Sequence, residues 1–260
     1  MDLQKKVFWQ IWLATRRSTT ELCPQLNKYS TQSYQWSTFI KCPYLEVKFF
    51  CIVFLMKKFP DIIPIFPLSG VIYFPKTNLP LNIFEQRYLD LVNDAYNKDK
   101  LMGMVQLKKT DDSVYEIGCL GKISDYQKSK DGRVLINLTG ISRFKILKEI
   151  SNKKLYREFQ VNYDNFNEDA NITRGEIDSN NLMENAKVFF KRNGLLLNWR
   201  EFEKLDPAQK INTLAMIAPI TNEEKQKLLE TISLENKVNT LDSIINFYLY
   251  ETNFNNQTIQ

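Results

Sequence analysis

Apolar and polar positions alternate in short runs from about residue 60 to residue 166, and prolines or glycines interrupt the runs. The segment IPIFPLSGVIYFPKTNLPLNIFEQRY at 63–88 alone contains four prolines. A proline cannot donate a hydrogen bond to a neighbouring strand, so it lies at strand ends, edges or bulges. The pattern therefore predicts very short strands that need partners from farther along the chain: Ile63–Phe66, Val71–Phe74 and Leu79–Leu81.

One helix and a further set of strands are expected after this segment. Phe84–Lys98 has apolar residues at helical spacing with charged residues between them, which is typical of an amphipathic helix. Asp131-Gly132 supplies the positive φ of a tight hairpin turn. We expect Gly140 to break the strand ladder that follows this turn, with Phe144–Ile150 forming another strand. The predicted strands are Leu101–Leu107, Tyr115–Tyr126, Val134–Thr139, Phe144–Ile150 and Glu158–Tyr163.

The C-terminal third has the helix start and stop signals that are typical of a helical bundle. A polar, acidic segment at 164–181 reads as a linker. The helix Leu182–Arg192 that follows ends at Asn193-Gly194, a common helix stop. Further helix starts are indicated by Asp206 before Pro207, by the spacing of Thr221 and Glu224, and by Ser233. We expect four or so helices, the last with Val238, Leu241, Ile245 and Tyr248 on one face.

These elements define the expected fold class, α+β. A small, partly open β-barrel with one helix precedes a C-terminal helical bundle. The expected organisation is an N-terminal extension at 1–57, a β domain at 58–166, a linker at 167–181, the bundle at 182–252 and a tail at 253–260. The extension shares no sustained period with the rest, and its apolar run at 49–56 is too short to span a bilayer. We expect it to be disordered or to precede the true start, with translation beginning at Met56.

Charge changes this picture only at the N-terminus. Seven basic and three acidic residues give residues 1–55 a net charge of +4, whereas residues 56–260 carry only +1. A nearly neutral body lacks the basic stripe that phosphate binding needs, so nucleic acid is not an expected partner. The absence of histidine removes Ser–His and Cys–His nucleophile pairs and His-ligated metals.

The four cysteines, at 23, 42, 51 and 119, contain no C-x-x-C pair. Neither a zinc site nor a thioredoxin-type site is indicated, and a buried free thiol at Cys119 fits a reducing, cytoplasmic compartment. GCLGK at 118–122 has the wrong spacing for a phosphate-binding loop and lies in an alternating strand pattern. We expect no catalytic residue, no cofactor and no metal. A small-molecule enzyme is the last-ranked alternative.

Several segments in order resemble the N-terminal domain of the ATP-dependent Lon protease, especially the short stand-alone proteins that carry only this domain. The resemblance covers about residues 60–166, with a weaker match in the helical tail. It implies a PUA-like pseudo-barrel. The segments that carry it are IPIFPL at 63–68, LPLNIFEQRY at 79–88, LMGMV at 101–105, YEIGCLG at 115–121, DGRVLI at 131–136 and LTGISRF at 138–144.

The resemblance implies protein binding related to proteolysis and quality control, without catalysis. The ATPase and the Ser–Lys peptidase of Lon lie C-terminal to the matched region, and this chain continues instead into the helical bundle. Expected partners are unfolded or partner polypeptides or a protease system, held in a groove between barrel and bundle or on an exposed strand edge. Candidate contacts are Phe84, Tyr88, Phe144 and Trp199, with core packing favoured for each. An RNA-binding PUA-like module is the alternative, and the oligomeric state stays open.

Overall fold

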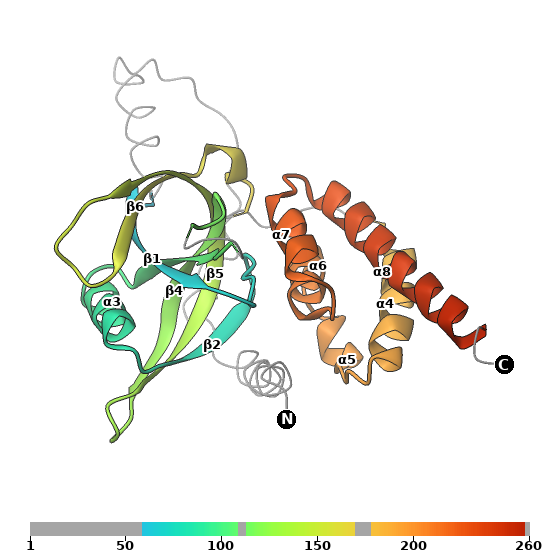
Figure 1. The fold of residues 1–260 in the computed structure, drawn as a ribbon. Helices are drawn as coiled ribbons and strands as arrows, with labels where there is room; N and C mark the ends of the chain where they lie inside the picture. Colours follow the sequence, from blue (N-terminus) through green and yellow to red (C-terminus); the bar gives the residue numbers. More distant parts are fainter. Residues whose placement is uncertain (1–58, 109–112, 170–177, 258–260) are drawn as a thin grey trace, which may run out of the picture.

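The computed structural model describes residues 59–108, 113–169 and 178–257, with side chains described as far as Tyr250. The expected extension at 1–57 and the start at Met56 lie outside the described residues. A ring of strands with one helix against it forms one side of the molecule, and a group of helices forms the other (Figure 1). The fold is therefore α+β, a pseudo-barrel followed by a helical bundle, as the sequence predicted.

Six strands and one helix make up the ring side of the described chain. The helix α3, Gln86–Asn97, packs against the ring with Tyr88, Leu91, Val92 and Ala95. The strands are β1 (Ile62–Leu68), β2 (Asn78–Ile83), β3 (Leu101–Gln106), β4 (Ile117–Lys128), β5 (Val134–Ile150) and β6 (Arg157–Asn162).

The long strand β5 closes the ring by pairing with different neighbours along its length. The order β5-β4-β3-β1-β6 returns to β5, because the second half of β5 pairs antiparallel with β6. Its first half, from Val134 to Thr139, pairs with β4 on one side and with β2 on the other. β1 and β3 are parallel, and the remaining pairs are antiparallel.

Two predictions about the strands were wrong. Val71–Phe74 is not a strand but part of the connection between β1 and β2, although Ile72, Tyr73 and Phe74 are buried. Gly140 does not end a strand, since β5 continues through it for 17 residues. The pairing of β5 with β4 is nevertheless interrupted beside Gly140, because Gly121 pairs with Gly140 and Leu120 with Ser142, which leaves Ile141 as an extra residue in β5.

Apolar side chains fill the inside of the ring. Because side chains alternate across a strand, Val105 and Leu120 belong to this cluster, whereas Met104 and Cys119 on the other face of β3 and β4 belong to the cluster shared with α3 and the bundle. Phe144 is fully buried at its centre, and a Cβ atom on Gly118 would lie 2.7 Å from the Phe144 ring and 2.5 Å from the Met104 carbonyl oxygen. Glycine at 118 thus leaves the space that the ring of Phe144 occupies. The cluster members are Ile63, Ile65, Val105, Leu120, Phe144, Phe159 and Val161.

Five α-helices follow β6 in the described chain, after a short 3-10 helix η2 at Asp164–Phe166. They pack together beside the ring, with the long α8 lying against α4 (Figure 1). Their bounds are α4 (Asn180–Arg192), α5 (Trp199–Phe202), α6 (Pro207–Ile217), α7 (Asn222–Glu230) and α8 (Leu234–Gln257).

Local capping signals fix most of the helix ends as predicted. Asp206 and Thr221 each form a complete capping box with the residue three positions on. The Ser233 hydroxyl accepts a hydrogen bond from the Asn236 N–H at 3.1 Å at the start of α8. Val238, Leu241 and Ile245 of α8 are buried on its predicted apolar face.

Candidate functional site

The four candidate contact residues lie in three different places. Phe84 is 67% exposed at the corner between β2 and α3, and Tyr88 of α3 is buried against Phe66, with the two ring centroids 4.2 Å apart. Phe144 fills the ring interior. Trp199 packs edge-to-face on Phe190 and Phe202 in the bundle. The four residues therefore do not form one site, and core packing accounts for Tyr88 and Phe144.

The ring and the bundle meet in a packed interface. One apolar cluster continues from Leu91 and Ile123 on the ring side to Leu214 and Leu241 in the bundle. Polar contacts cross the same junction: the Gln226 side chain of α7 donates to the Ile117 carbonyl at 3.1 Å. This part of the boundary is therefore closed to a ligand while the two units stay together.

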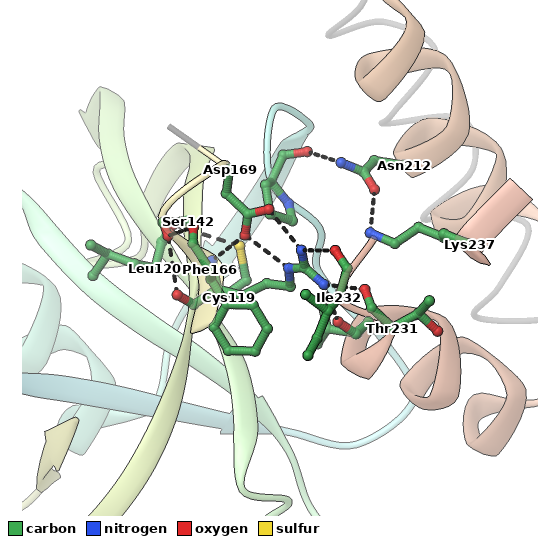
Figure 2. Close-up of polar contacts among 12 residues, drawn as sticks. Cys119, Leu120, Ser142, Phe166, Asp169, Asn212, Thr231, Ile232 and Lys237 are labelled. Atoms are coloured by element: carbon green, nitrogen blue, oxygen red, sulfur yellow. Dashed lines mark hydrogen bonds and ion pairs between the residues drawn. The ribbon is translucent and has the colours of Figure 1, made fainter. Parts of the chain in front are cut away.

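Arg143 of β5 is the centre of the polar contacts at this junction, and Figure 2 shows its partners Asp169, Thr231 and Ile232. Its guanidinium forms a two-point ion pair with Asp169, with Nε–Oδ2 and Nη2–Oδ1 distances of 2.8 Å. The backbone N–H of Arg143 also donates to Asp169, at 2.9 Å. Both side chains are nearly enclosed, so the pair is only weakly screened by solvent.

The remaining guanidinium donors reach the C-terminal end of α7. They bond to the carbonyl oxygens of Leu229 at 3.0 Å and Ile232 at 3.1 Å, and also to that of Thr231. A helix leaves its last carbonyls without partners inside the helix, and a cation there also meets the negative end of the helix dipole. The five N–H groups of the guanidinium thus all have acceptors: two bond to Asp169 and three to these carbonyl oxygens. We call Arg143, Asp169 and these three carbonyls the Arg143 clamp.

A second polar contact crosses the junction beside the Arg143 clamp. The Asn212 side chain of α6 donates to the Pro75 carbonyl at 3.0 Å and accepts from the Lys237 ammonium at 2.9 Å. Lys237 of α8 is 2% exposed, and its Nζ lies 5.5 Å from the centre of the Phe74 ring. Figure 2 shows Asn212 between the ring side and Lys237. The amide thus connects the loop before β2 to two helices.

Burial decides the charge states in this region. It lowers the pKa of Lys237 to about 7, and the nearby Arg143 charge acts in the same direction, while Asp169 and Cys119 oppose it. Burial also raises the pKa of the Cys119 thiol well above its usual value, so the buried free cysteine expected there is confirmed and is not a thiolate. The Tyr73 hydroxyl is buried as well, and no described residue bonds to it.

Other features of the described chain offer little chemistry. Among the described residues, no three His, Cys, Asp or Glu side chains are grouped so that they could hold a metal ion. A surface pocket of about 460 Å³ lies between the start of α4 and α8, with Asp178, Glu235 and Asp242 among its lining residues. No helix in the described ranges is long and apolar enough to cross a membrane.

Together the ring and bundle define a class: a small strand pseudo-barrel joined to a helical bundle through a buried arginine. The family model for the ATP-dependent protease La (LON) substrate-binding domain matches residues 62–246, which include both units. The chain therefore belongs to the family of Lon substrate-binding domains, as its sequence motifs indicated.

Similar proteins agree with this family. A Lon protease of Syntrophus aciditrophicus is 26% identical in an alignment 208 positions long that covers 74% of this chain and 26% of that protein. The crystal structure of a Lon N-terminal domain protein from Xanthomonas campestris has a TM-score of 0.54 at 19% identity, covering 70% of this chain and 97% of that one. The N-terminal domain of Mycobacterium avium complex Lon protease has a TM-score of 0.52 at 16% identity, and the match covers 71% of this chain and 98% of that one. These two structures show a shared fold.

The curated Lon proteases extend far beyond the matched region. The chain spans about a quarter of the length of the curated relatives that it matches over most of its own length. The similarity thus concerns one part of Lon, and nothing in it reaches the rest of those proteins.

Glu85 and Arg87, two exposed residues close along the chain, form an ion pair with an N–O distance of 2.9 Å, whereas the partners of Arg143 are distant along the chain. Those partners lie 26 and 86 to 89 residues away along the chain. One local signal was present: Ser142 and Arg143 are consecutive polar residues between the apolar Ile141 and Phe144. A buried arginine needs partners for all its donors, so such a position predicts a long-range contact.

Proposed function

We propose that the protein is a non-catalytic module that binds polypeptide segments. The observation that carries the proposal is the match of a substrate-binding domain family across residues 62–246, which includes ring and bundle alike. The absence of histidine from the sequence agrees with binding rather than acid–base chemistry. The proposal includes a role as an adaptor that presents unfolded chains to a protease system, which membership of this family supports.

Binding to an unfolded client tests this proposal directly. Reduced, carboxymethylated α-lactalbumin is the probe and native α-lactalbumin is its matched control, with affinity measured by fluorescence anisotropy. We expect the unfolded form to bind at least about tenfold more tightly, because only an unfolded chain offers extended apolar segments. Equal affinity for both forms, or none for either, contradicts the proposal.

RNA binding is the competing outcome of the same measurement. The near-neutral charge of residues 56–260 disfavours it, since phosphate contacts need a basic surface. We expect a labelled single-stranded RNA to show no salt-sensitive binding in the conditions used for the client. RNA binding that weakens steeply with salt, in the absence of client binding, replaces the polypeptide proposal with the RNA-binding one.

A further inference from the structure

β2 is the strand at which the sheet is open. Among the strands that the structure describes, every other one has a neighbour on both sides, whereas β2 pairs with β5 alone. Figure 1 shows β2 on the outside of the ring, laid along the first half of β5. An open strand edge presents a row of backbone donors and acceptors to which another chain can add.

The register shows which backbone groups face the open edge. Pro80 has no N–H, and prolines within paired strands are found with the nitrogen toward the free side. The opposite residue, Asn137, agrees, because its carbonyl accepts from the Ser124 hydroxyl at 3.0 Å and so points toward β4, away from β2. Backbone groups alternate along a strand, so residues 78, 80 and 82 face outward. They offer three carbonyl acceptors and the N–H donors of Asn78 and Asn82.

The open edge also lacks the charges that usually guard such strands. β2 has the sequence NLPLNI, with no charged residue, and its neighbours Glu85 and Arg87 neutralise each other in an ion pair. Two apolar side chains lie exposed beside it. Phe84 is 67% exposed directly after the strand, and Leu135 of β5 is 41% exposed opposite Asn82, on the same face.

We propose that an extended, uncharged, partly apolar segment of a client polypeptide adds to the open edge of β2 as a further strand. Backbone hydrogen bonds to residues 78, 80 and 82 hold the segment, and an apolar client side chain rests on Phe84. The neutral edge favours an uncharged segment, because an unpaired charge would be desolvated there without a partner. This inference rests on the proposed polypeptide-binding function and locates its site.

Selective N-methylation of a peptide tests whether backbone pairing holds the client. The probe is a capped seven-residue peptide of alternating threonine and valine with a central phenylalanine. Two isomers carry N-methyl groups on alternate amides, one on the odd positions and the other on the even positions. An added strand uses one of its two edges, so we expect one isomer to lose at least about tenfold in affinity while the other stays within about twofold of the parent. Equal binding by both isomers, or equal loss by both, overturns the proposal.

Side-chain variants test the apolar part of the site. Phe84→Ala should weaken binding of the parent peptide by at least about fivefold, because an exposed aromatic anchor is removed. Leu196→Ala is the matched control, since Leu196 is 82% exposed in the bundle, away from β2. The control should bind as the wild type does. Equal affinities for Phe84→Ala, Leu196→Ala and wild type contradict the assigned position.

The outcomes separate this inference from the proposed function. Binding of the unfolded client without any effect of N-methylation or Phe84→Ala retains the function and rejects β2 as its site. No binding of either client or peptide rejects both. Sedimentation velocity of the free protein gives the last outcome: a dimer that the peptide dissociates assigns the edge to a second copy of this chain and overturns the client proposal.

Discussion

Arg143 and the open edge of β2 belong to the same six-stranded sheet, but their polar groups differ: those of the Arg143 clamp are paired, and those at the β2 edge are not paired with a described strand. At the clamp, all five guanidinium donors meet acceptors, and the pair with Asp169 is closed off from water. At β2, the backbone groups of residues 78, 80 and 82 face away from β5, and no described strand pairs with that edge. Satisfied buried groups hold a structure together, whereas open strand edges invite a partner. The Arg143 clamp therefore stabilises the contact between ring and bundle, whereas the edge of β2 is suited to binding another chain.

The largest effect is expected from breaking the clamp. Arg143→Met removes the guanidinium from three carbonyls and leaves the nearly enclosed Asp169 carboxylate with only the backbone N–H of residue 143, so the free energy of unfolding should fall by about 5 kcal/mol. Urea denaturation followed by circular dichroism measures it. The exposed pair provides the control, because Arg87→Met should cost less than about 1 kcal/mol.

A second variant keeps this prediction testable if Arg143→Met does not fold. Arg143→Met combined with Asp169→Leu removes both charges, so no carboxylate is left buried alone. The double variant should therefore be more stable than the single one, although below wild type because the α7 carbonyls remain unpaired. A double variant less stable than Arg143→Met contradicts the view that the pair acts as a unit.

Phe144 and Phe84, one buried and one exposed, extend the comparison to apolar side chains. Phe144 is completely buried inside the ring, and Phe144→Ala should lower the free energy of unfolding by about 4 kcal/mol through the cavity it creates. The same denaturation measurement checks this value. A loss below about 1 kcal/mol would show that the ring collapses around the missing side chain.

Lys237 offers a way to change the junction through pH. Its pKa is about 7 in the folded protein and near 10.5 in the unfolded chain. Between these values the unfolded state binds more protons, so this group makes the protein more stable as pH rises from 7 to 10.5 and less stable as pH falls through that window. Lys237→Met should raise the free energy of unfolding at pH 7 by about 1–3 kcal/mol and remove this rise.

Only the difference between wild type and Lys237→Met is informative, because other groups also titrate in this range. Lys225 is one of them, since burial lowers its pKa to about 8 and both proteins retain it. The difference should shrink as pH approaches 10.5. A difference that stays constant from pH 7 to pH 10.5 means that Lys237 does not change its charge there.

The sequence predicted the parts of this molecule that depend on neighbours along the chain. The capping boxes at Asp206 and Thr221 and the apolar face of α8 are local, and they form as expected. The prediction that separate strands lie on the two sides of Gly140 was wrong, because this glycine is needed for a contact with a residue far along the chain. A Cβ atom there would lie 2.3 Å from the Phe74 carbonyl oxygen, so glycine permits a close approach and does not end β5.

Long-range contacts explain why the candidate site was harder to predict. Tyr88 and Phe144 lie within the family motifs, but burial, which depends on the whole fold, puts them in the core. The Arg143 clamp joins segments up to 89 residues apart, and no spacing rule connects them. The open edge of β2 also depends on the complete strand order, although Pro80 in the sequence already indicated an edge strand.

The smallest effect on stability is expected from Phe84→Ala, and it is best compared with the effect of Phe144→Ala. Its side chain is 67% exposed, so Phe84→Ala should change the free energy of unfolding by no more than about 0.5 kcal/mol. Urea denaturation of Phe84→Ala beside Phe144→Ala makes the contrast between two residues of one type. A loss of 2 kcal/mol or more at Phe84 would mean that it packs in the folded protein as a structural residue. Stability close to wild type leaves the large exposed aromatic ring without a structural role and free to contact a partner at the edge of β2.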